Sequence, residues 1–332
     1  MPGDEERDNE SDDIRRFDVV TVGESLGLLT VERPGRLHNG AATRLGFGGA
    51  ESNVAIGIAR LGGRAAWIGR LGADAIGELI VRELRAENVA PYAVHDADHA
   101  TSLMLKQHPQ PRTSHITYYR RDQAGSHLNP ADLPPDVIES ASILHVTGIS
   151  AALGEQPRAT IHAAIDRARA TGTLVSFDVN HRQTLWRDPG EAAPAYRDLL
   201  SRADIVFAGE GEAELVTGES EPGAALGGLL GFGAQCAVLK RGANGAIAGS
   251  ADGRFESASA LTVPVVDTVG AGDAFVAGWL VAAARSSPLS SCLQTAISCG
   301  AWACTNDGDW EGAPTSDDLV RLADVGADPV TR

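Results

Sequence analysis

Short apolar runs alternate along the chain with longer segments in which apolar positions recur every three or four residues. Residues 19–22, 143–146 and 205–208 have the length of buried strands, whereas residues 158–170 have the spacing of an amphipathic helix. The same series includes strands expected at 65–69, 174–178 and 237–239 and helices expected at 52–61, 75–87, 192–201, 224–230, 273–284 and 289–305. Such alternation predicts an α/β fold in which parallel strands are joined by crossover helices.

Two regions interrupt this alternation. Residues 28–47 and 101–120 carry roughly alternating polar and apolar positions, broken by turns that contain Pro, Gly or Asn. A period of two is typical of strands that bury only one face. We therefore expect these two regions to form a small antiparallel sheet beside the main domain.

Composition narrows the class of protein. The 332 residues are 43% hydrophobic and 22% charged, which is ordinary for a globular protein and allows one large domain or two smaller ones. The net charge of −16 argues against nucleic-acid binding, which depends on clusters of Lys and Arg. Residues 4–13 contain seven acidic residues and one Arg, so we expect residues 1–16 to form a disordered acidic tail.

Several other classes of site and location are also disfavoured. There is no apolar stretch of about 18 residues and no basic leader, so we expect a cytoplasmic protein that does not contact a membrane. The nine histidines show no recognised metal-ligand spacing, and we assign His181 no catalytic role. The cysteines lack C-x-x-C spacing and lie in apolar surroundings, which favours buried free thiols. They are Cys236, Cys292, Cys299 and Cys304.

Residues 267–275, with the sequence Asp-Thr-Val-Gly-Ala-Gly-Asp-Ala-Phe, are the most informative part of the chain. Small residues allow backbone N–H groups to converge at the start of the following helix, where the helix dipole favours an anion such as a transferred phosphate. Asp273 at the same turn could accept the proton of an attacking hydroxyl. The segment is consistent with phosphoryl transfer, and a plain helix N-terminus with an acidic first turn is the alternative.

This segment resembles the C-terminal signature of the ribokinase-like (PfkB) carbohydrate kinases, and residues 48–55 resemble their N-terminal signature. The resemblance implies a central, mostly parallel β-sheet flanked by helices, with a small β-sheet lid formed by about 28–47 and 101–120, in one kinase domain over 17–332. It implies ATP and Mg²⁺ as cofactors. The catalytic residues that it implies are the base Asp273 and an anion hole of Gly270, Ala271 and Gly272.

Four further strings resemble the 2-keto-3-deoxygluconate kinases of that family, namely residues 118–120, 124–126, 178–186 and 308–314. The resemblance implies phosphorylation of 2-keto-3-deoxygluconate at its terminal hydroxyl to give the 6-phosphate. The substrate-binding residues that it implies are Gly48, Gly49, Asn53, Tyr118, Arg120, Arg182, Asp273 and Asp309.

The chemistry of the implied contacts agrees with an acidic substrate. A carboxylate is held best by guanidinium groups, whereas a neutral sugar is usually held by Asp and Asn side chains. Arg120 and Arg182 offer two such groups, and Leu26 and Gly27 leave no acceptor in the loop where many neutral-sugar kinases carry an Asp. Two alternatives stay open: Arg120 could be a solvated lid residue, and Arg182 could serve only the nucleotide phosphates.

The nucleotide-binding residues implied by the resemblance lie mostly in the C-terminal half. They are Asn180, Arg182, Lys240, Gly242, Gly245, Gly270, Gly272, Ile297, Gly300 and Ala301. Glu212 is implied to organise Mg²⁺ through water, with a plain surface glutamate as the alternative. Three positions depart from the usual pattern of the family, namely Met104, Gly209 and Ile297, and a requirement for a monovalent cation stays open.

Three other functions are alternatives to phosphorylation of 2-keto-3-deoxygluconate. Another kinase of the family, acting on fructose, ribose or 5-keto-2-deoxygluconate, is the nearest rival, and a kinase-like binding protein without turnover is a more remote one. A dinucleotide dehydrogenase is excluded because no G-x-G-x-x-G follows the first strand. Since a small isolated sheet has exposed edges and an unburied face, we also expect a homodimer or higher homo-oligomer formed through the lid.

Overall fold

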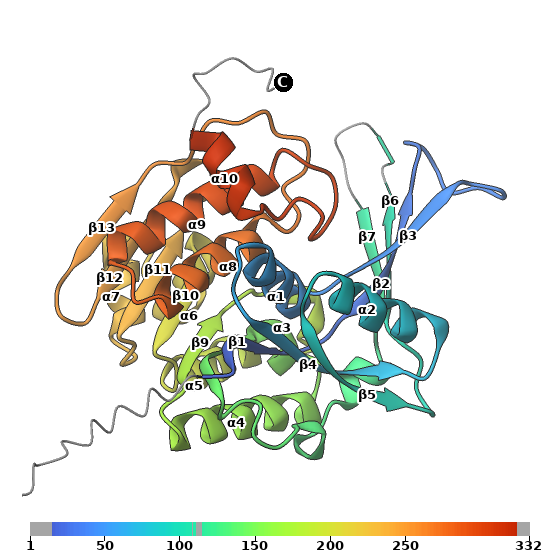
Figure 1. Ribbon diagram of the computed structural model, residues 1–332, viewed down its shortest axis with the longest axis horizontal. Coiled ribbons are helices and arrows are strands. Elements are labelled where there is room, and N and C mark those ends of the chain that lie inside the picture. The colour runs from blue at the N-terminus through green and yellow to red at the C-terminus, as the bar shows by residue number, and fades with distance from the viewer. Residues whose placement is uncertain (1–14, 108, 111–114, 324–332) are drawn as a thin grey trace, which may run out of the picture.

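The computed structural model describes residues 15–107, 109–110 and 115–323, and a nine-stranded sheet forms the centre of this part of the chain (Figure 1). Its strand order is β13-β12-β11-β10-β9-β8-β1-β4-β5. The strands are β1 (Phe17–Val22), β4 (Ala65–Gly72), β5 (Ala90–Asp96), β8 (Ala141–Thr147), β9 (Leu174–Asp178), β10 (Ile205–Gly209), β11 (Cys236–Lys240), β12 (Ala246–Ser250) and β13 (Phe255–Ala258).

The pairs from β5 to β11 are all parallel, as the alternation of strands and helices predicts. β12 is antiparallel to both of its neighbours, and this hairpin was not predicted. Only residues 241–245 connect β11 to β12, which is too short for a crossover, so the chain must turn back. The predicted fold class is confirmed.

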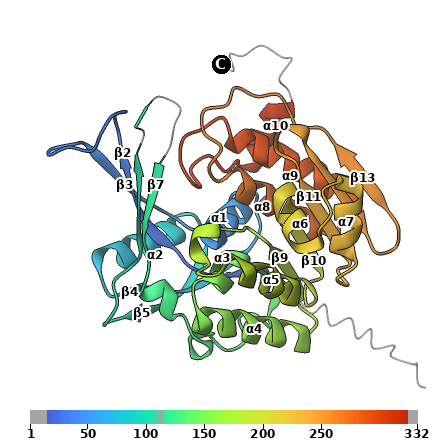
Figure 2. The same cartoon turned by 180° about the vertical axis from the view of Figure 1, so that it is seen from behind.

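Helices cover both faces of the sheet, and each layer has its own buried core (Figures 1 and 2). One layer consists of α1 (Ala50–Arg60), α2 (Ala75–Ala86), α8 (Ala271–Ala284) and α9 (Leu289–Ala303). The other consists of α4 (Glu155–Ala170), α5 (Ala192–Leu200), α6 (Glu210–Thr217) and α7 (Pro222–Leu230). The remaining α-helices of the described part are the short α3 (Gly148–Ala152) and α10 (Ser316–Ala323).

A second, smaller sheet projects from the main domain and forms the lid (Figure 1). Its order is β3-β2-β6-β7, from β2 (Leu26–Val31), β3 (Thr43–Gly48), β6 (Leu103–Gln107) and β7 (His115–Tyr119). The expectation of a purely antiparallel sheet is wrong at its centre, because β2 and β6 are parallel. β2 follows β1, and β6 follows β5. Because β1 and β5 run in the same direction in the main sheet, β2 and β6 enter the lid in the same direction.

Residues 1–14 of the tail predicted for residues 1–16 lie outside the described residues. Arg15 is described, and its guanidinium donates to the Glu139 carbonyl at 2.7 Å, so packing begins before residue 17. Residues 324–332 of the predicted kinase domain also lie outside the described part. Among the described residues, no helix combines the length and the hydropathy that crossing a bilayer requires.

Candidate active site

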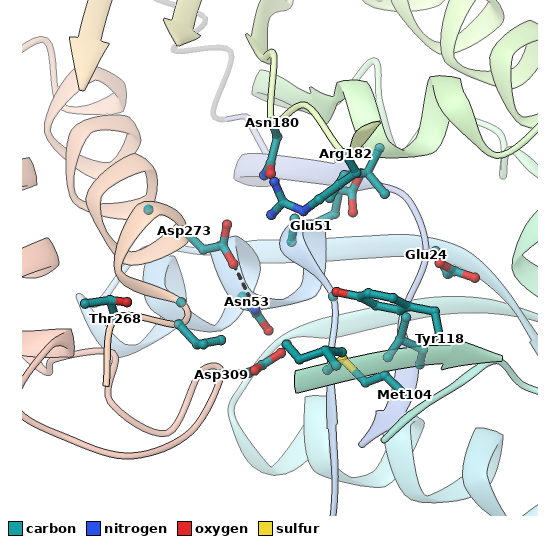
Figure 3. A pocket seen from close by; sticks show the side chains of 18 of the residues that line it. Glu24, Glu51, Asn53, Met104, Tyr118, Asn180, Arg182, Thr268, Asp273 and Asp309 are labelled. Atoms are coloured by element: carbon teal, nitrogen blue, oxygen red, sulfur yellow. Dashed lines mark hydrogen bonds between the residues drawn. The ribbon is translucent and has the colours of Figure 1, made fainter. Parts of the chain in front are cut away.

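Two adjoining cavities lie beside the carboxyl ends of the parallel strands, the lid and the start of α8. Their volumes are about 520 and about 570 Å³, and Lys240, Thr268 and Gly272 line both. Ligands of parallel α/β sheets bind outside the carboxyl ends of the strands. The two cavities together are therefore the candidate active site, and Figure 3 shows side chains of the first.

The structure brings nearly all of the predicted site residues to these cavities. The first is lined by Gly49, Asn53, Tyr118, Arg120, Asn180, Arg182, Glu212, Lys240, Gly270, Gly272, Asp273 and Asp309, and by Met104 and Gly209. The second is lined by Lys240, Gly242, Gly245, Ala271, Gly272, Ile297, Gly300 and Ala301. Gly48 does not line either cavity but lies next to Asp309, where a Cβ would be 2.0 Å from Oδ2 of that residue. The lack of a side chain at Gly48 leaves room for the carboxyl group of Asp309.

The glycine turn before α8 is fixed by its surroundings. Gly270 has φ 74°, in the left-handed region, and a Cβ there would lie 1.7 Å from the carbonyl oxygen of Asp309. A side chain is therefore excluded both by the backbone conformation and by contact. The turn presents the positive end of α8 to both cavities, which favours a phosphate there.

Asp273 lies in the first turn of α8 and faces the first cavity (Figure 3). Nδ2 of Asn53 donates to its Oδ2 at 2.8 Å. Burial raises the pKa of Asp273 to about 6, against the lowering effects of Asn53, Arg182 and Lys240. At neutral pH the group is largely ionised and is a stronger proton acceptor than a solvated carboxylate, which suits a general base.

Two more acids share this cavity. Burial, reinforced by the negative charge of Asp273, raises the pKa of Asp309 to about 7. Burial also raises the pKa of Glu51 to about 7, although Thr147 and Ser150 each donate to its Oε1 at 2.7 Å. No role was predicted for Glu51, because its place within the N-terminal signature gives no sign of burial.

Arg120 is not solvated, contrary to one of the alternatives left open. It forms an ion pair with Glu24, and both side chains are buried at the base of the lid. Oγ of Ser102 donates to the other oxygen of Glu24 at 2.6 Å. The expectation that this loop offers no acceptor is wrong, because Glu24 lines the first cavity. Burial of Glu24 depends on the folded lid, which residues 23–27 alone do not reveal.

Arg182 is exposed and projects into the first cavity from the loop after β9 (Figure 3). Its guanidinium donates a 3.2 Å hydrogen bond to the carbonyl of His181. Asn180, two residues earlier, has φ 38°, a left-handed conformation that Asn tolerates better than most residues. The turn at Asn180 directs the following segment over the strand ends.

Two carboxylates near Lys240, which lines both cavities, are engaged with neighbouring groups. Nζ of Lys240 is 2.6 Å from Oδ2 of Asp178; burial alone would lower the pKa of Lys240, but Asp178 and Glu212 outweigh it and raise that pKa. The two oxygens of Glu212 accept the backbone N–H groups of His181 and Gly209 at 2.8 and 2.7 Å. Glu212 is therefore not a plain surface glutamate, since it ties the ends of β9 and β10 together.

Comparison with known proteins gives the family. Residues 16–316 match the pfkB family of carbohydrate kinases. This chain belongs to the PfkB family. The family resemblance of residues 48–55 and 267–275 is confirmed, and the chain is an ATP-dependent sugar kinase.

Named relatives of this PfkB kinase act on different sugars. A 2-dehydro-3-deoxygluconokinase from Bacillus subtilis is 35% identical over 309 residues, which cover 92% of this chain and 95% of the relative. A fructokinase from Klebsiella pneumoniae is also 35% identical, over 282 residues that cover 82% and 91% of the two chains. The solved structure of a fructokinase double mutant from Vibrio cholerae, in a form with bound fructose, ADP and potassium ion, is 28% identical with a TM-score of 0.80 and covers 92% and 98%.

Proposed function

We propose that this PfkB kinase transfers the γ-phosphate of ATP to the terminal hydroxyl of 2-keto-3-deoxygluconate, giving the 6-phosphate. The carrying observation is Arg182, whose exposed guanidinium reaches into the same cavity as Asp273. A guanidinium there can bind a sugar carboxylate or the phosphate near it. The name of the Bacillus subtilis relative, 2-dehydro-3-deoxygluconokinase, is a synonym for the same activity and supports the same substrate.

Three residues that line this cavity each have one buried polar atom without a hydrogen-bond partner among the described residues. The atoms are Oδ1 of Asn53, Nε of Arg120 and Oε2 of Glu51. Buried polar groups are normally paired, so each is a candidate contact for a bound substrate. Asn53 Oδ1 can accept from a sugar hydroxyl, and Arg120 Nε can donate to a carboxylate oxygen.

The proposed reaction divides between the two cavities. Asp273 accepts the proton of the terminal hydroxyl, and the N–H groups from Gly270 to Gly272 stabilise the transferring phosphate. Arg182 and Asn180 face the phosphates from the opposite wall, with Lys240, Gly242 and Gly245 along the triphosphate. The apolar wall at Ile297, Gly300 and Ala301 suits the adenine.

Mg²⁺ would be held mainly by the phosphates and water in this proposal. Glu212 lines the first cavity, but both of its oxygens already accept backbone N–H groups, so its contact with the ion goes through water. Mg²⁺ keeps several of its waters in such sites, so the arrangement fits that ion. When bound, the ion neutralises charge on the phosphates. The potassium ion in the Vibrio cholerae structure makes potassium dependence a further property to measure.

A neutral ketose is the second candidate, and Glu24 is the observation that favours it. Its carboxylate lines the first cavity and could accept from sugar hydroxyls in the way typical of neutral-sugar sites. The name of the Klebsiella pneumoniae relative points the same way.

The deciding experiment is a coupled ATP-consumption assay across 2-keto-3-deoxygluconate, its galactonate epimer, fructose and ribose, with and without potassium. We expect the highest kcat/KM for the sugar acids. A higher kcat/KM for fructose would contradict the proposed substrate and favour the second candidate. Asp273→Asn run in parallel separates turnover at this site from a contaminating kinase.

A further inference from the structure

Away from the cavities, three potential metal ligands meet at the base of the lid. His99 lies in the loop between β5 and β6, whereas Asp122 and His127 follow β7. One ligand atom from each lies within 4.8 Å of the others. Because β6 and β7 are antiparallel, the segment before β6 and the segment after β7 meet at the open end of this pair. The spacing of these residues in the sequence gives no sign of the cluster.

The three side chains lie close together at the base of the lid. The imidazole rings of His99 and His127 stack with centroids 3.6 Å apart and an interplanar angle of 21°. Nε2 of His127 is 2.8 Å from Oδ1 of Asp122. The side chains are 31%, 30% and 80% exposed for His99, His127 and Asp122, so an ion from solvent can reach them.

A buried carboxylate orients His99 from behind. Nδ1 of His99 is 3.1 Å from Oδ2 of Asp96, which is 3% exposed. Arg70 and the backbone N–H groups of Asp98 and His99 donate to Asp96 and hold it in place. Asp96 is positioned to accept the Nδ1 proton of His99, which leaves the lone pair on Nε2. A carboxylate on the far nitrogen is the arrangement that orients histidines as metal ligands.

We propose that His99, His127 and Asp122 bind one divalent transition-metal ion of the zinc class, with water in the remaining position. Two imidazole nitrogens and one carboxylate oxygen suit Zn²⁺, which binds them at about 2.0–2.2 Å. The ion takes the place of the direct contact between His127 and Asp122. Mg²⁺ prefers an all-oxygen shell, so this ion is distinct from the one that accompanies ATP.

The bound ion would link the two chain segments that connect the lid to the main domain. One ligand precedes β6 and two follow β7, so the ion bridges both ends of the hairpin that carries Tyr118 and Arg120 to the substrate cavity. An ion that binds only the folded state stabilises it by mass action. Occupancy of the site should therefore raise the melting temperature of the whole chain.

The test uses the full-length, chelator-treated chain without nucleotide. Co²⁺ is titrated and followed by its visible absorption, Zn²⁺ is then added as a competitor, and the melting temperature is measured with and without Zn²⁺. We expect one ion per chain and a higher melting temperature. His99→Ala and His127→Ala should each weaken binding by about 10- to 100-fold or more, since even loss of an orienting partner costs this much.

The matched control is His162→Ala. His162 is another half-exposed histidine near an aspartate, with Nε2 3.4 Å from Oδ2 of Asp198, and it belongs to no such cluster among the described residues. This variant should bind Co²⁺ like the wild type. If an alanine variant misfolds, Asp122→Asn serves instead, because Asp122 has φ 56° and Asn tolerates that conformation.

Three results would overturn the proposal. The first is a wild type without saturable Co²⁺ binding, and the second is equal affinity in wild type and the His99, His127 or Asp122 variants. The third is a thiolate-to-metal charge-transfer band, which would assign the ion to one of the four cysteines.

Discussion

Asp273 combines ionisation at neutral pH with a raised basicity, and for a solvated carboxylate a gain in one is a loss in the other. It is mostly ionised at neutral pH, yet its pKa of about 6 makes it a better base than an exposed carboxylate. Burial supplies the second property, and the Asn53 hydrogen bond limits how far burial can raise the pKa. The activity of the site should therefore depend on both residues in distinct ways.

Asp273→Asn should lower kcat by about 10²- to 10⁴-fold, because proton acceptance is lost while the side chain keeps its size. Binding of ATP should change little, since the N–H groups of the glycine turn remain. Steady-state kinetics and nucleotide titration measure the two effects. A variant that keeps more than roughly a tenth of the wild-type kcat would remove Asp273 from the role of base, since that loss is below the usual range.

The pH dependence of kcat should report Asp273 when the wild type is compared with Asn53→Ala. Because protonation removes the base, kcat should fall as pH drops through about 6 in the wild type. In Asn53→Ala the ionised carboxylate loses a hydrogen bond, so the pKa rises and the fall in kcat should begin at a higher pH. An acid limb that stays in place or moves to lower pH in this variant would contradict the assignment.

The two arginines should differ when substituted. Arg182→Ala should lower kcat and weaken binding of the sugar acid, because its exposed guanidinium reaches the cavity. Loss of a charge-assisted bond costs about 1.5–3 kcal/mol, or about 10- to 150-fold. Arg120→Ala should also destabilise the fold, because Glu24 is left buried without its ion-pair partner.

The combined variant Arg120→Met with Glu24→Gln separates these effects, since it removes both charges together. Its loss of affinity for the acid then reports substrate contact alone. Arg121→Ala, at the exposed neighbouring position, is the matched control and should behave like the wild type. Unchanged affinity for the acid in both Arg182→Ala and the combined variant would leave the family assignment intact and remove the sugar-acid substrate.

At the scale of elements, the sequence predicts the strands and helices that a local apolar pattern determines. It does not predict strands that form only because they pair with a neighbouring strand. β9 is found at its observed bounds, because the apolar residues Leu174, Val175 and Phe177 lie in a short segment between turns. β12, with the sequence Ala-Ile-Ala-Gly-Ser, has no bulky alternation, and its pairing with β11 makes it a strand. The site divides similarly: motif residues such as Asp273 were found, whereas Glu24 and Glu51 matter through burial by distant elements.

The lid is also tied to the glycine turn by one buried ion pair. Nζ of Lys106 on β6 is 2.5 Å from Oδ2 of Asp267, which begins the segment leading to α8. Lys106→Met should reduce the free energy of unfolding by about 3–5 kcal/mol, because Asp267 loses its partner in a largely buried position. Urea denaturation measures this.

The double variant Lys106→Met with Asp267→Asn is the control for this pair. It should lose clearly less than the sum of the two single losses, because each single variant leaves one charge without its main partner. Additive losses would show that Lys106 and Asp267 do not stabilise each other.

For the whole molecule, we propose that two copies pair through the outer face of the lid. The strand register places Leu29, Leu45, Leu105 and Tyr119 on the face opposite Met104 and Tyr118, which line the first cavity. Leu45 is 48% exposed and Tyr119 is 59% exposed, and β3 and β7 are the open edges of the sheet. Pairing two lids would bury this apolar face and protect those edges.

Light scattering on the wild type at micromolar concentration should therefore give the mass of a dimer or larger oligomer. Leu45→Glu should yield monomers, because a two-fold interface would bury the new charge twice in an apolar surface. Val320→Glu, at an exposed apolar position on α10, is the matched control and should keep the wild-type mass. A wild type that is monomeric at this concentration would contradict lid pairing. A Leu45→Glu variant that stays oligomeric would move the interface to another surface.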